Sequence, residues 1–140
     1  VVQTIFIISG FIFTAISYRK EIASRKVYTL IQLSQIKKEI WDEFIDNPSL
    51  HRINQRDVDL EKHPITIEER YHVKQHILQM YSVFLANKYE QIELPEEFLL
   101  DMKDFLSFTI PNKIWQSISP YQAKGFIQFI DQLRIYANKN

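Results

Sequence analysis

The first pattern along the chain is an apolar stretch that contains no charged residue. Residues 1–18 read VVQTIFIISGFIFTAISY. A helix of this length rises about 27 Å, close to the ~30 Å hydrocarbon core of a bilayer, so the stretch predicts a transmembrane anchor at residues 1–18. Tyr18 would then lie at the membrane interface. A buried core helix and a cleaved signal peptide are the alternatives, although a signal peptide requires a basic start and small residues before the cleavage site.

A basic cluster follows the apolar stretch directly. Within residues 19–26, one acidic residue, Glu21, accompanies four basic ones: Arg19, Lys20, Arg25 and Lys26. Because positive charge is retained on the cytoplasmic side of a span, the cluster predicts a cytoplasmic C-terminal side. These side chains would also attract anionic lipid headgroups, by about 1 kcal/mol each. We therefore expect a single-pass membrane protein, with an anchor at 1–18 and a cytoplasmic helical bundle at 19–140.

Helical periodicity dominates the chain after the basic cluster. Neither proline nor glycine occurs between Lys20 and Asn47, which predicts that the helix continues unbroken out of the membrane. Apolar residues recur at helical spacing, at Val27, Leu30, Ile31, Leu33, Ile36, Ile40, Trp41, Phe44 and Ile45. This face is wider than the seam of a two-stranded coiled coil, so it predicts several helices packed around it. Pro48 disfavours helical backbone at Asn47 and predicts the end of the helix.

A capping signal marks the second helix. Residues 49–64 are mixed and charged, which predicts a polar loop with a short helical turn at Leu50 and Ile53. Thr66 and Glu69 have the spacing of a capping box, so the second helix is predicted to begin there and to end near residue 90. Its apolar stripe consists of Val73, Ile77, Met80, Tyr81 and Phe84.

Proline residues divide the remaining chain. Pro95, followed by two acidic residues, predicts the start of a third helix, and Pro111 predicts its end. A short helix is expected over residues 111–118. Ser119 and Gln122 have capping-box spacing, which predicts the start of a last helix. No segment shows the two-residue period of a strand. The predicted fold class is all-α: an N-terminal transmembrane helix followed by an antiparallel bundle of four main helices plus a short helix.

Composition excludes several classes of site. The chain has no cysteine, so thiolate metal sites and cysteine nucleophiles are impossible. Its formal net charge of +0 gives no electrostatic argument for nucleic-acid binding. Gly10 and Gly125 are the only glycines, and no Gly-rich phosphate loop is present. The sequence therefore identifies no cofactor and no small-molecule substrate.

One group of residues has the spacing of metal ligands. His72 and His76 lie four residues apart on the predicted second helix, and Glu69 lies one turn earlier, so the three could share one face. A di-iron bundle would need a second Glu-x-x-His pair, which the sequence lacks. We therefore expect a solvated or hydrogen-bonded histidine pair and keep the three residues only as weak metal candidates. The paired carboxylates fall at helix starts or on expected exposed faces, so no catalytic residue is predicted.

Large aromatic side chains are frequent in the predicted bundle: Tyr81, Phe84, Tyr89, Phe98, Phe105, Phe108 and Trp115. Their helical spacing assigns most of them to the core. A short bundle cannot bury so many rings completely, and a leftover groove could bind a partner helix. The residues of such a surface cannot be identified from the sequence.

Short motifs give the chain a family resemblance. After V-V-Q-T-I and the basic stretch come Asn47-Pro48-Ser49-Leu50, Glu69-Arg70, Tyr81, Tyr89, Leu94-Pro95-Glu96-Glu97, Pro111 to Trp115, Ser119-Pro120-Tyr121 and Gly125-Phe126. In this order they resemble bacterial membrane-anchored helical proteins of unknown function, in which N-P-E-L, E-R and a late Y-S-P-E-F-type element occur. Ser49 stands where that group usually has an acid. The resemblance implies a helical fold and membrane anchoring, and it implies no activity.

These features together predict a non-catalytic, membrane-tethered helical interaction domain, or a small subunit of a membrane-associated complex. Its partners would be the lipid bilayer and a protein, either another chain or a second copy. A small bacterial membrane effector or defence-type signalling protein is the alternative. A metal-dependent enzyme that uses the three weak metal candidates is a further alternative.

Overall fold

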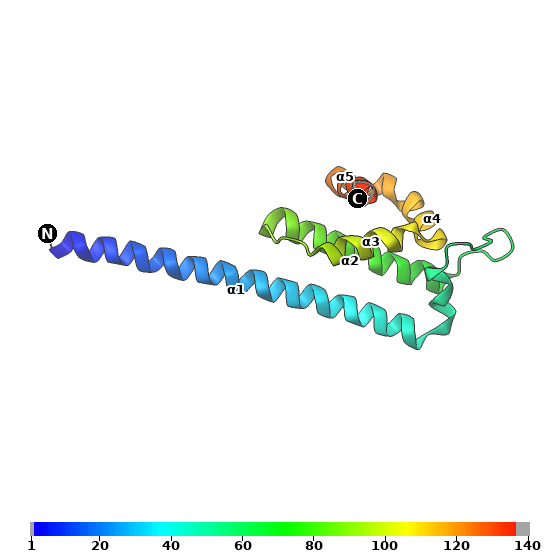
Figure 1. Ribbon diagram of the computed structural model, residues 1–140, viewed down its shortest axis with the longest axis horizontal. Helices are drawn as coiled ribbons and strands as arrows, with labels where there is room; N and C mark the ends of the chain where they lie inside the picture. The colour runs from blue at the N-terminus through cyan, green and yellow to red at the C-terminus, as the bar shows by residue number, and fades with distance from the viewer. Residues whose placement is uncertain (1, 137–140) are drawn as a thin grey trace.

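The protein is all-helical over the residues that the structure describes. A computed structural model describes the backbone of residues 2–136 and the side chains of residues 9–136. The elements in chain order are α1 (Val2–Asp46), the 3-10 helix η1 (Pro48–Asn54), α2 (Ile67–Glu90), α3 (Glu96–Ser107), α4 (Thr109–Ile118), the 3-10 helix η2 (Ser119–Tyr121) and α5 (Lys124–Ile135). No strand occurs among them, so the predicted all-α helical bundle is confirmed (Figure 1).

The long helix α1 lies antiparallel to α2 (Figure 1). Leu33 and Ile40 of α1 are buried in this contact. The Gln79 side chain of α2 donates a hydrogen bond of 3.1 Å to the Leu33 carbonyl oxygen. At the far end of α2, the Thr29 hydroxyl donates to Glu90 at 2.8 Å. These polar contacts hold the register of the two helices at the middle of α2 and at its C-terminal end.

The first half of α1 extends past the end of α2 and away from the other helices (Figure 1). We call residues 2–25 the arm. At 1.5 Å per residue, the arm is about 36 Å long. Lys26, the first residue after it, donates from Nζ to the Gln91 carbonyl oxygen at 3.5 Å, which places the start of the packed region at the C-terminal end of α2.

Apolar residues of α2, α4 and α5 form the centre of the core. Phe126 of α5 is completely buried, and its ring contacts Trp115 of α4 edge-on, with ring centroids 5.5 Å apart. Trp115 is buried too, so it locks α4 onto the bundle as a core residue. η1 contributes Leu50 and Ile53, both fully buried, which explains why a short turn before a polar loop carries two apolar residues.

The apolar face predicted on α1 is only partly covered. Leu33 and Ile40 are buried, whereas Val27, Ile31 and Ile45 are each more than half exposed. The prediction that several helices surround α1 is therefore wrong, because α1 packs mainly on α2 and η1 along one stripe.

Pro111 does not end the third helix, contrary to the prediction. α3 ends at Ser107, and Pro111 is the third residue of α4. A proline fits there because the first backbone N–H groups of a helix have no partner within the helix. The break falls at Phe108, whose backbone is extended, and the N–H of Thr109 donates to Gln55 at 3.4 Å. A contact from a distant loop therefore replaces the helical hydrogen bond.

The capping box predicted at Ser119 and Gln122 is also absent. Ser119 has helical backbone angles and starts η2, so it lacks the extended geometry of an N-cap. α5 begins later, after Ala123. The expected short helix, α4, has 10 residues and is nearly as long as α3 and α5, which have 12 each.

Candidate functional site

The arm of α1 exposes large apolar side chains in several directions. Phe11 and Phe13 are each 73% exposed, and Ile12 and Ile16 are about half exposed. Consecutive positions on a helix point about 100° apart, so residues 11–13 alone surround most of the axis. A helix that is apolar on all sides is otherwise found within a core or a membrane.

Within the part of the chain that the structure describes, no helix is both long enough and apolar enough to cross a membrane. This finding does not support the span expected at residues 1–18. The side chains of residues 1–8, the first part of that span, lie outside the described residues.

The basic cluster lies where the arm meets the bundle. Arg19, Lys20 and Arg25 are exposed, and Arg25 pairs with Glu21 one turn earlier at 3.2 Å. Lys26 reaches back to the end of α2. The cluster therefore lies between the apolar part of the arm and the packed helices, and its membrane-proximal role stays a prediction.

The histidine pair of α2 is not solvated, contrary to the expectation. His72 is 1% exposed, and neither of its ring nitrogens has a hydrogen-bond partner among the described residues. Its Nδ1 lies 3.5 Å from a carboxylate oxygen of Glu43 on α1. His76 is partly buried beside it, with ring centroids 4.9 Å apart, and it stacks on Phe105 of α3 at 4.4 Å.

This environment keeps both histidines neutral. Burial lowers the pKa of His72, and the nearby charge of Glu43 opposes that effect only in part. Burial also lowers the pKa of His76, which the charges of His72 and Lys37 bring further down, to about 3. At neutral pH each ring therefore offers one N–H donor and one nitrogen acceptor.

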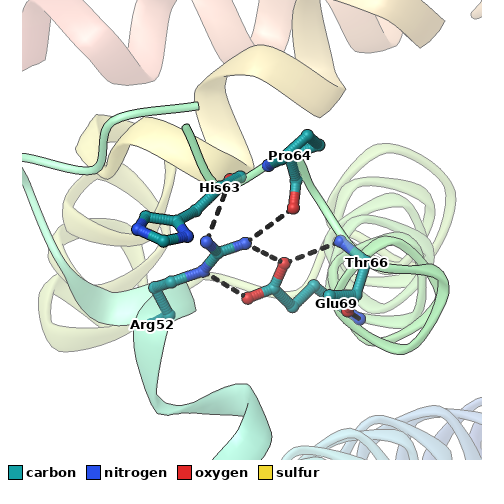
Figure 2. A network of polar contacts seen from close by, with 5 residues as sticks. All are labelled: Arg52, His63, Pro64, Thr66 and Glu69. Atoms are coloured by element: carbon teal, nitrogen blue, oxygen red, sulfur yellow. Dashed lines mark hydrogen bonds and ion pairs between the residues drawn. The ribbon is translucent and has the colours of Figure 1, made fainter. Parts of the chain in front are cut away.

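Glu69 does not face the histidines. Its carboxylate receives two hydrogen bonds of 2.8 Å from the guanidinium of Arg52 in η1 and one of 2.9 Å from the Thr66 N–H (Figure 2). The same guanidinium donates to the carbonyl oxygens of His63 and Pro64, at 2.9 and 3.0 Å. Figure 2 shows the guanidinium enclosed between the loop and the start of α2.

The capping box predicted at Thr66 and Glu69 is confirmed, and Glu69 serves it together with Arg52. The three weak metal candidates are therefore not brought together, because the Glu69 carboxylate is already bonded on both oxygens. Among residues whose side chains the structure describes, no three His, Asp or Glu residues are grouped to hold a metal ion.

A cavity of about 220 Å³ lies between α1, α2 and α3. Its walls are mainly apolar and include Trp41 of α1, Met80 of α2, and Phe98, Met102 and Phe105 of α3. His76 is part of the wall and makes no hydrogen bond among the described residues. The cavity therefore combines an aromatic lining with three neutral polar residues, Asn54, His76 and Gln79, and three charged ones, Lys37, Asp101 and Asp104.

An ion pair borders the cavity. The Lys37 ammonium of α1 donates to the Asp101 carboxylate of α3 and also lies 4.6 Å from the centre of the Phe98 ring. This pair joins two helices that are far apart in the sequence. It also compensates the positive charge that lies nearest to the cavity.

Several of these residues had a signal in the sequence. His72 and His76 occupy the same helical stripe as Val73, Ile77 and Met80, so their burial could have been predicted from the period. Nothing in the sequence pairs Arg52 with Glu69 or Lys37 with Asp101, because both pairs depend on how distant elements pack.

Comparison with known protein families, with curated proteins and with solved structures finds no match. The resemblance to bacterial membrane-anchored proteins of unknown function therefore stays a hypothesis that rests on the sequence motifs.

Proposed function

We propose that this chain is a non-catalytic, membrane-tethered helical interaction domain whose bundle lies on the cytoplasmic side. The observation that carries the proposal is the arm of α1, which projects from the bundle and exposes Phe11, Ile12, Phe13 and Ile16 (Figure 1). Apolar side chains on all sides of an isolated helix are unfavourable in water and favourable in lipid. The side chains of residues 11–18 carry no charge, so none opposes insertion.

The basic cluster supports the orientation. Arg19, Lys20 and Arg25 are exposed directly after the apolar part of the arm. Basic residues next to a span are retained on the cytoplasmic side, which supports a cytoplasmic bundle. Attraction to anionic headgroups would hold the base of the arm at the lipid surface.

Exposed apolar residues on the packed half of α1 support the interaction role. Val27, Ile31 and Ile45 lie on the side of α1 that the other helices leave uncovered, and each is more than half exposed. A partner protein or a second copy would bury them on association. The chain would then act as a small subunit that presents its bundle to a membrane-associated complex.

Charges placed in the arm are expected to release the protein from the membrane. Each lysine in the middle of a span costs about 2.5–3.5 kcal/mol, so Ile12→Lys combined with Ile16→Lys lowers the membrane-bound fraction by more than about 100-fold. Flotation of cell membranes on a density gradient measures this fraction. The control is Ile31→Lys, which changes an exposed apolar residue on the same helix beyond the basic cluster and leaves flotation unchanged. Membrane binding that survives the double substitution contradicts the tether.

The orientation has its own test. A peptide tag after Asn140 is expected to resist protease added outside intact cells and to be cleaved once the membrane is permeabilised, because the basic cluster retains the C-terminal side in the cytoplasm. A reporter tag on an outward-facing protein confirms that the protease is active. Cleavage of the tag in intact cells would show that the bundle lies outside the cell. It would contradict the orientation but not the membrane attachment.

A further inference from the structure

We propose that the cavity between α1, α2 and α3 is a binding site for a small, uncharged aromatic molecule with one hydroxyl or N–H group, of the size of phenol or indole. The proposal concerns a different part of the molecule from the arm and does not depend on membrane attachment.

The size of the cavity sets the size of the ligand. It measures about 220 Å³. An enclosed apolar protein cavity of about 150 Å³ is large enough to bind benzene. The space here, which opens to solvent, therefore accepts one aromatic ring or two small fused rings.

The walls favour an aromatic ligand over an aliphatic one. Trp41, Phe98 and Phe105 offer ring faces and edges, and aromatic pairs gain from offset or edge-to-face contacts beyond the area that they bury. Met80 and Met102 add thioethers, which contact ring edges favourably and adapt their shape to the ligand.

His76 supplies the polar contact. Its ring is held by stacking on Phe105 at 4.4 Å and by the edge of Trp41 at 6.4 Å, so its direction is fixed before a ligand enters. Its nitrogens make no hydrogen bond among the described residues. A ligand hydroxyl or N–H would satisfy one of them.

The charges around the cavity select against ions. Lys37 is paired with Asp101 and lies over Phe98, so an anion would have to separate an existing ion pair. Asp104, which also lines the cavity, repels an anion, and because its side chain is exposed, its charge is already solvated and needs no cationic ligand. The pKa of His76 is lowered to about 3, so the imidazole brings no charge of its own at neutral pH. Burying an unpaired ligand charge against these walls is strongly unfavourable, whereas a neutral ligand avoids that penalty.

The two methionines make the site directly observable. The chain contains two, Met80 and Met102, and both line the cavity. We expect saturable shifts of both methyl signals when the full chain, labelled with methyl-13C-methionine and held in lipid nanodiscs, is titrated with phenol or indole. Empty nanodiscs give the background of ligand partitioning. Absence of any shift up to the solubility of the probes overturns the proposal.

A substitution at His76 separates the contribution of the polar imidazole from that of the aromatic walls. His76→Phe keeps a ring on Phe105 and removes the polar atoms, so it should weaken phenol and indole binding about fivefold to tenfold and leave toluene binding unchanged. The matched control, His63→Phe, makes the same change on the exposed loop and should alter neither. Equal losses for phenol and toluene in His76→Phe overturn the role of the imidazole.

Two further measurements test the cavity and the charge. Val83→Phe, which places a ring in the wall, should abolish the methyl shifts with every probe, and unchanged binding in this variant overturns the location. Benzoate and benzyltrimethylammonium should bind at least tenfold more weakly than phenol, and tighter binding of either ion overturns the uncharged class. The probe series uses the unmodified chain, so it decides the proposal even where Val83→Phe fails to fold.

Discussion

Arg52→Ala is expected to lower the free energy of unfolding by about 3–5 kcal/mol, because it leaves a buried carboxylate without its partner. Glu69 is 1% exposed and depends on two hydrogen bonds of 2.8 Å from this guanidinium (Figure 2). The substitution also frees the carbonyl oxygens of His63 and Pro64, which Arg52 ties to the start of α2. Urea denaturation of the full chain, followed by tryptophan fluorescence, measures the change.

Matched variants distinguish the buried pair from a general effect of losing charge. Arg56→Ala removes an exposed arginine close to Arg52 in the chain and should change stability by less than about 0.5 kcal/mol. Glu69→Gln added to Arg52→Ala removes the stranded charge and should recover part of the loss. A double variant no more stable than Arg52→Ala alone would show that the cost comes from the loop carbonyls and not from the carboxylate.

The pH dependence of this pair has a definite sign. Burial raises the pKa of Glu69, but the hydrogen bonds from Arg52 and Thr66 and the charge of Arg52 outweigh it, so the pKa lies below its ordinary value. The pair therefore stabilises the fold above the ordinary glutamate range, and its contribution is lost as the pH falls through the lowered pKa.

Local signals were sufficient where a helix end is set by its own residues. Asn47-Pro48 ends α1 and the Thr66–Glu69 box begins α2, because proline restricts the residue before it and the box satisfies free N–H groups within one turn. These helix ends depend only on residues that are close in the chain, so the sequence alone is enough to predict them.

The same reasoning failed where a distant element decides. Pro111 has the appearance of a helix end, yet the end of α3 is set at Phe108, where the Thr109 N–H bonds to Gln55 from the loop after η1. Ser119 and Gln122 have capping-box spacing, but Ser119 continues the helical backbone of α4. Neither the end of α3 nor the start of α5 can be predicted without knowing how α4 packs against η1.

The candidate site shows the same division. The helical period predicts that Met80, Phe98, Met102 and Phe105 face the core, and all four do. The period does not reveal that these side chains leave a cavity beside His76, because a void depends on the spacing of three helices. In the arm, apolar residues do not face a core: the large apolar side chains of residues 11–16 are exposed in the fold.

Mild acid is expected to destabilise the bundle before its carboxylates titrate. His76 has its pKa lowered to about 3, chiefly by burial and then by the charges of His72 and Lys37, whereas an unfolded histidine titrates near 6.5. Well above pH 6.5 the histidines are neutral in both states, so they contribute no pH dependence. Below it the unfolded chain binds a proton that the folded chain does not, so stability falls as the pH falls and levels off only near the folded pKa.

The expected loss for His76 is about 2.3 kcal/mol between pH 6.5 and 4.5, because the slope reaches 1.36 kcal/mol per pH unit only once the unfolded histidine is fully protonated. His72 acts in the same direction because its pKa is also lowered, with Glu43 opposing part of that shift. Urea denaturation at intervals across this range measures the slope, and the difference from His76→Phe isolates the histidine, because the carboxylates begin to contribute below about pH 5.5 in both proteins. His76→Phe should flatten the slope by about one proton, while the exposed control His63→Phe should leave it unchanged. A wild-type stability that is level from pH 6.5 to 4.5 would show that His76 is protonated in the folded bundle, and the neutral wall assigned to the cavity would then be wrong.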